Sequence, residues 1–132
     1  MSNQLINQLR KNRSSSLVID GVIIKTIRPT QLEYWGLIER AGGSNHALAV
    51  LLLKDFVIGW DANGINLGIP GGDANPIDFS SDLFIEWVGE KTERHAGVTK
   101  HIFESYANHY GLGHKGSDAT ALDVELGKQK PG

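Results

Sequence analysis

The chain contains no cysteine, a single methionine and only four prolines among its 132 residues. The absence of cysteine excludes disulfide frameworks, thiolate zinc sites, iron–sulfur clusters and cysteine nucleophiles. Neither sign of charge dominates, because thirteen Lys and Arg stand against fifteen Asp and Glu, for a formal net charge of −2. The composition therefore lacks the basic excess of a general nucleic-acid-binding protein, and we expect no nucleic-acid partner.

Long hydrophobic runs are also missing. The longest, 47–53, is far shorter than the about 20 apolar residues that a membrane-spanning helix needs. The polar segment 1–16 lacks the apolar core of a signal peptide. These absences predict no membrane partner and a location in the cytoplasm of the cell that makes the protein.

Glycine, by contrast, is abundant, at 16 residues, and it gathers in the stretch 59–72 and after residue 110. Segment 61–79 consists mostly of residues typical of turns, and such long connections are usually functional or mobile. We therefore predict a flexible N-terminal arm over 1–16, a single globular domain over 17–111 and a flexible C-terminal tail over 112–132.

The segment 17–28 predicts a β-hairpin. It is rich in β-branched residues and carries Asp20 and Gly21 at its centre. Asp-Gly between two such runs is a strong hairpin signal, because both turn positions favour a positive φ.

Four segments after the hairpin have helical character. Leu32, Trp35 and Ile38, which follow Pro29, are spaced for one helical face. Ser44 is a good N-cap for a second segment, 47–60, whose apolar residues lie all round; a buried strand is the competing interpretation, but the length favours a helix. Two more amphipathic segments, 83–88 and 98–110, follow. The prediction is a mainly α fold, in which the small N-terminal β-hairpin precedes a compact bundle of about four helices.

No constellation of residues in the chain argues for catalysis. A small metal-dependent enzyme would need two of the four C-terminal histidines to converge with a carboxylate. None of them stands at the i, i+3 or i, i+4 spacing that places two ligands on one helical turn. We therefore expect no catalytic, cofactor-binding or metal-binding residue and no cofactor; the histidines concerned are His95, His101, His109 and His114.

Surplus apolar surface points instead to a partner. Core packing is the commoner role of tryptophans beside aliphatic residues, but tryptophan is also enriched in interface anchors. The apolar segment 47–58 carries more hydrophobic surface than one small domain easily covers. We expect binding of a hydrophobic partner or self-association, with the partner-binding candidates Leu52, Phe56, Trp60, Phe79 and Trp87.

The middle of the chain resembles the small tail assembly chaperones of long-tailed, siphovirus-like bacteriophages. The similarity lies in an apolar segment ending in Trp60-Asp61, a turn with Gly64, the element 76–80 and the apolar segment 83–87. It covers about residues 17–110. The chain departs from the pattern in the stretch 67–75, which lengthens the loop.

The resemblance implies a mostly α-helical, non-enzymatic protein. Such chaperones bind the tape measure protein, keep it soluble and recruit tail tube protein in the cytoplasm of the infected bacterial host. They are absent from the mature virion. The alternative function is that of a virion structural protein, a component of the tail or of the head–tail connector, and a small metal-dependent enzyme ranks below both.

Overall fold

The computed structural model describes residues 2–112 as eight helices and strands. The chain divides into two compact units, one ending at Ile102 and one beginning at Phe103. The predicted C-terminal tail, apart from Leu112, lies outside the described residues. The second unit contributes the end of helix α5, Thr92–His109, which Gly111 terminates with a φ of 69°.

The N-terminal hairpin is confirmed. Strands β1, Ser14–Ile19, and β2, Val22–Ile27, pair antiparallel around Asp20 and Gly21, whose φ angles are 52° and 80°. The hairpin starts three residues earlier than predicted, at Ser14 rather than at residue 17. Residues Ser2–Asn12, predicted as part of a flexible arm, form helix α1.

The predicted mainly α fold with a bundle of about four helices is wrong. The segment predicted as one helix over 47–60 is helical only in α3, Asn45–Phe56, and continues as strand β3, Val57–Asp61. β3 pairs antiparallel with β2, so that a three-stranded sheet of order β1-β2-β3 forms, and the domain is a mixed α/β fold. Pairing with the free edge of β2 overrides the helical tendency of a segment that contains no breaking residue before Gly59.

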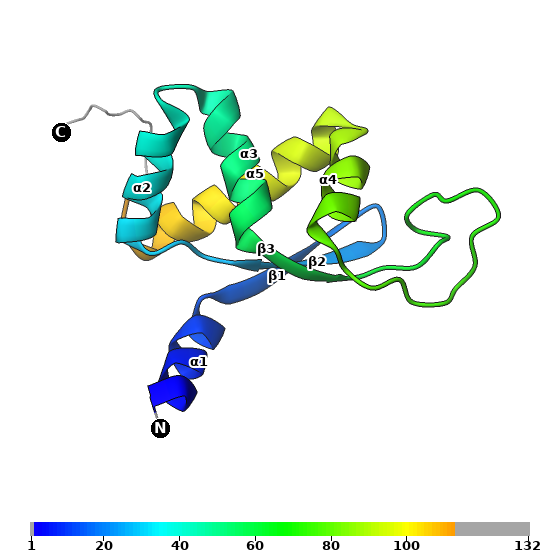
Figure 1. Ribbon diagram of the computed structural model, residues 1–132, viewed down its shortest axis with the longest axis horizontal. Helices are drawn as coiled ribbons and strands as arrows, with labels where there is room; N and C mark the ends of the chain where they lie inside the picture. The colour runs from blue at the N-terminus through cyan, green and yellow to red at the C-terminus, as the bar shows by residue number, and fades with distance from the viewer. Residues whose placement is uncertain (1, 113–132) are drawn as a thin grey trace. The chain divides into compact units, whose positions relative to one another are not determined.

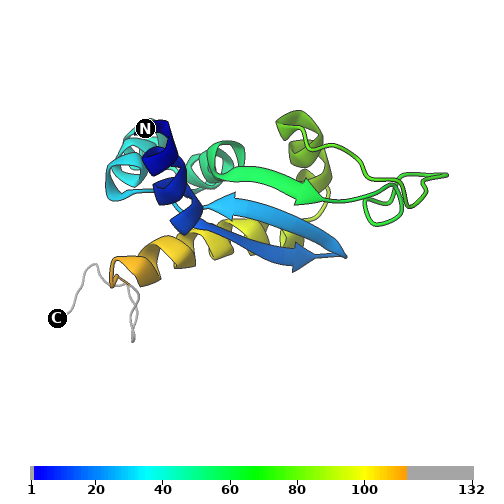
Figure 2. The ribbon, with the colours of Figure 1, turned by 90° about the horizontal axis from the view of Figure 1, so that it is seen from below.

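Helices cover one face of this sheet. These are α2, Gln31–Ala41; α3; α4, Ser81–Gly89; and the part of α5 that belongs to the first unit (Figure 1, Figure 2). Val22 and Ile24 point into the core with Phe84, Val98 and Ile102, all fully buried. The other face of the sheet is open, and Figure 2 is seen from that side.

Three helices begin at the caps that their sequences provide. The hydroxyls of Ser44 and Ser80 accept hydrogen bonds from backbone N–H groups three residues on, as predicted for Ser44. Thr30 forms a full capping box with Glu33 at the start of α2. These caps fix where α2, α3 and α4 start and therefore which side chains they turn away from the core.

Candidate partner-binding surface

The residues predicted to bind a partner lie mainly inside the domain. Leu52, Phe56, Trp60 and Trp87 are buried, and Phe79 is half-buried. Trp60 lies at the centre of an aromatic cluster, with ring centroids 5.6 Å from Phe79 and 6.3 Å from Trp87. The structure therefore brings three of the five together as packing around β3 and α4, and a partner cannot reach the four buried side chains while the domain stays folded.

Trp60 and Trp87 differ in how their indole N–H groups are satisfied. Trp60 Nε1 donates a hydrogen bond to the carbonyl of Ile77 at 2.9 Å, which ties the segment before α4 to β3. Trp87 Nε1 is buried without a hydrogen-bond partner in the part of the chain that the structure describes. The guanidinium of Arg94 lies 4.2 Å from the centre of a Trp87 ring, a cation–π contact.

The large exposed apolar side chains of α2 form a stripe that is not part of the aromatic cluster. Leu32, Trp35 and Ile38 are 78%, 61% and 48% exposed. We call these three residues the α2 stripe. They recur every third residue, so they occupy neighbouring positions on the helix surface. An exposed patch of this kind, with a tryptophan at its centre, has the composition of an interface anchor.

Sequence reasoning placed these three residues on one face but gave no sign that the face is exposed. The core side of α2 is formed by Tyr34, Leu37 and Ala41, which are buried. The sequence of α2 has apolar residues on both of these faces, and this pattern could have indicated an exposed apolar face. A short helix at the edge of a small domain can bury only one of the two.

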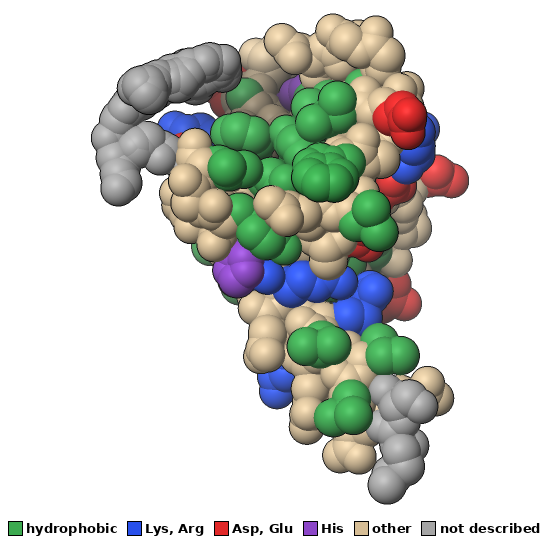
Figure 3. Space-filling view, turned by 90° about the vertical axis from the view of Figure 1, so that its left-hand side faces the viewer, with side chains coloured by type: hydrophobic (Ala, Val, Ile, Leu, Met, Phe, Trp, Pro, Cys, Tyr) green, Lys and Arg blue, Asp and Glu red, His purple; other side chains and the backbone are tan. Residues whose placement is uncertain are grey.

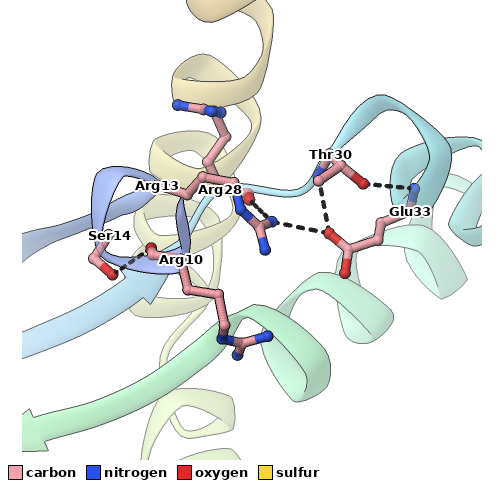
Figure 4. Close-up of polar contacts among 6 residues, drawn as sticks. All are labelled: Arg10, Arg13, Ser14, Arg28, Thr30 and Glu33. Atoms are coloured by element: carbon pink, nitrogen blue, oxygen red, sulfur yellow. Dashed lines mark hydrogen bonds and ion pairs between the residues drawn. The ribbon is translucent and has the colours of Figure 1, made fainter. Parts of the chain in front are cut away.

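A cleft of about 310 Å³ adjoins α2, and charged side chains from three helices line it. Arg13 pairs with Glu33 at 3.0 Å and also donates to the carbonyl of Arg28 at 2.7 Å (Figure 4). Arg40 and Asp55 also line the cleft and pair with each other at 3.1 Å. Arg10 lines the same cleft and has no acidic partner among residues 2–112.

The network around Glu33 favours its charged form. Partial burial alone raises the pKa of Glu33, but the Thr30 backbone N–H and the charge and hydrogen bond of Arg13 outweigh that effect. The pKa therefore lies below its ordinary value. The result is a fixed carboxylate at the start of α2, which complements the positive end of the helix dipole.

The segment 61–79, predicted as a long turn-rich connection, is organised by its own hydrogen bonds. Asn63 and Asn66 each donate a backbone N–H to the other's side-chain oxygen, at 2.8 and 2.9 Å. Asn63 also pairs with Pro76 in an isolated bridge, which closes the segment into a loop. Inside it, the backbones of Gly64 and Gly72 cross so closely that a Cβ on Gly72 would lie 2.5 Å from the Gly64 oxygen.

The histidines are dispersed. His95 stacks on His46 with ring centroids 6.4 Å apart, and His101 Nε2 shares a hydrogen bond of 2.9 Å with the hydroxyl of Ser15. His109 packs edge-on against Tyr110 in the second unit, and His114 lies outside the described residues. Within residues 2–112, no three His, Asp or Glu side chains gather in a group that would hold a metal ion.

The comparisons with known proteins found no relative. No family model, no curated protein and no solved structure matches the chain. In the described part of the chain, no helix is both long and apolar enough to span a membrane. The function is therefore inferred from the surface of the molecule and from the sequence pattern of residues 17–110.

Proposed function

We propose that the protein is a non-enzymatic phage tail assembly chaperone, which binds the tape measure protein and supports tail tube assembly in the host cytoplasm. The observation that carries the proposal is the α2 stripe, because an exposed tryptophan flanked by two aliphatic residues suits contact with an apolar helical client. The resemblance of residues 17–110 to such chaperones supplies the identity of that client.

The physical task of such a protein agrees with this surface. A long helical client with an uncovered apolar stripe aggregates unless another protein shields it. The α2 stripe presents three apolar side chains along about two helical turns, which is the contact length of a helix-on-helix packing. Its flanks carry both signs of charge, Glu39 and Arg40, which limit nonspecific adhesion.

Co-expression with the tape measure protein of the same phage tests the proposal. We expect the chain to keep that client in the soluble fraction and to co-purify with it. The double variant Leu32→Ser, Trp35→Ser removes the centre of the stripe, and we expect it to fold normally but to lose most of the client. Ile65→Ser is the matched control, because Ile65 is 64% exposed on the loop, away from α2.

Mass spectrometry of purified particles separates this function from its alternative. A chaperone is absent from the finished virion, whereas a tail or head–tail connector component is present in stoichiometric amounts. Detection of the chain in particles at such a level would contradict the proposal. Retention of the client by the folded double variant would contradict the assignment of the stripe.

A further inference from the structure

Helix α1 has no buried residue among its described side chains. Every residue from 3 to 12 is exposed, including Leu5, Ile6 and Leu9 at 62%, 52% and 66%. A helix of 11 residues is marginal in water without tertiary packing. Something outside the chain's own core is therefore needed to stabilise it.

The apolar residues of α1 and the α2 stripe lie on the same side of the molecule. Figure 3 shows hydrophobic side chains over α2 in the upper part of this face and a second group on α1 below it. A band of Lys and Arg side chains separates the two groups. We call Leu5, Ile6 and Leu9 the α1 stripe.

We propose that a second copy of this chain covers both stripes, with α1 of each copy lying along α2 of the other. The C-terminal end of α1 lies beside the N-terminal end of α2. Arg13, which directly follows the last residue of α1, pairs with Glu33 in the first turn of α2. A two-fold axis at this junction brings the α1 stripe of one copy opposite the α2 stripe of the other. The two helices then run antiparallel, with Leu9 facing Leu32.

Charge favours this pairing over a contact between two α1 helices. α1 carries Arg10 and Lys11 and no acidic residue, so two α1 helices side by side repel each other. α2 contributes Glu33 and Glu39. The antiparallel arrangement places the basic end of α1 beside the Glu33 end of α2.

The area available is that of a stable dimer. The exposed fractions of the six side chains amount to roughly 700 Å² per copy, so a reciprocal contact covers up to roughly 1,400 Å², within the about 1,200–2,000 Å² of specific interfaces. Neither stripe alone reaches that range. The reciprocal contact covers both of them in one closed assembly.

Sedimentation velocity of the full chain over a range of concentrations, without any client, tests this inference. We expect wild type to dimerise. The α1 variant Leu5→Ser, Leu9→Ser and the α2 variant Leu32→Ser, Trp35→Ser should each weaken dimerisation by about a thousandfold, because each loses two large side chains from both contacts. Ile65→Ser should dimerise as wild type does. Circular dichroism and thermal unfolding verify that the variants are folded.

An equimolar mixture of the two variants is the decisive sample. A heterodimer of the two retains one unmodified contact, α1 of the α2 variant on α2 of the α1 variant. The mixture should therefore associate more tightly than either variant alone. A monomeric wild type, variants that dimerise like wild type, or a mixture no tighter than its components would each overturn the reciprocal contact.

The inference goes beyond the proposed function and does not depend on it. The second copy and the client use the same α2 stripe, so a client that binds there must displace the second copy from it. A monomer that still keeps its client soluble would refute the dimer and leave the chaperone function standing. A dimer that ignores the tape measure protein would do the reverse.

Discussion

The crossing of Gly64 and Gly72 makes the loop 61–79 sensitive to a single methyl group. In Gly72→Ala, the new Cβ would lie 2.5 Å from the Gly64 oxygen and 2.6 Å from the Gly64 carbonyl carbon. Because 3.4 Å is the lower end of ordinary van der Waals contact, the two backbones must separate by about 0.9 Å. Both contacts are backbone atoms, so no side-chain rotation relieves the overlap.

The hydrogen bonds at the crossing set the size of the effect. Ile69 donates its N–H to the Gly64 oxygen at 2.9 Å, and Gly72 donates to the Ile69 carbonyl at 2.8 Å. Losing both costs about 1–3 kcal/mol at the usual net contribution of a hydrogen bond. We expect Gly72→Ala to lower the free energy of unfolding by about 2 kcal/mol. This cost cannot exceed the free energy of opening the loop locally, because beyond that value the loop opens while the rest of the domain stays folded.

Urea unfolding measures the total cost, and amide hydrogen exchange measures where it falls. Exchange should accelerate at Ile65 and Ile69, whose N–H groups bond to Asp73 and Gly64 within the loop, but not in the sheet. Gly89→Ala is the control, because nothing lies within 4 Å of the position of its Cβ. If Gly72→Ala matched Gly89→Ala in both stability and exchange, the backbone crossing would be refuted.

Two further predictions concern the core and the carboxylates. Trp60→Phe should cost about 1 kcal/mol more in urea unfolding than Trp87→Phe, because only the first removes a hydrogen bond and leaves the Ile77 carbonyl unpaired; equal costs would contradict this. The hydrogen bond from Arg94 lowers the pKa of Asp20 against the opposing effect of desolvation, and the pKa of Glu33 is lowered as well. Both groups therefore stabilise the fold above the ordinary carboxyl pKa range, and that stability is lost as the pH falls through their lowered pKa values. Urea midpoints at several pH values should fall less on acidification in Asp20→Asn and Glu33→Gln than in wild type, and parallel curves would argue against the two interactions.

Local sequence signals gave reliable predictions where a few adjacent residues decide the structure. The turn at Asp20 and Gly21 depends on two backbone angles, and the start of α3 depends on the hydroxyl of Ser44. In each case the stabilising interaction lies within three or four residues, so the local sequence contains all the residues that determine the local structure.

The third strand could not be predicted in the same way, because its cause lies elsewhere in the chain. Val57 and Ile58 follow α3 without a glycine or proline, and only the free edge of β2, some thirty residues earlier, draws them into the sheet. The burial of most predicted partner-binding residues could not be predicted for a related reason. The apolar patterns of α2 give two stripes, and the packing of α3 against α2, not the periodicity, decides that Leu37 is buried and Trp35 is exposed.

The bridge between Asn63 and Pro76 has a consequence for how this chain tolerates change. The loop leaves and re-enters the domain at two residues that already face each other across a strand spacing. The loop can therefore change in length without moving the end of β3 or the start of α4, provided that two contacts with the rest of the domain are kept: Asn66 donates its side-chain N–H to the Gly21 carbonyl, and Leu67 is buried. The loop is therefore an insertion joined to the domain at its two ends and at Asn66 and Leu67, and between these points its length can vary while the sheet and its helices keep their positions.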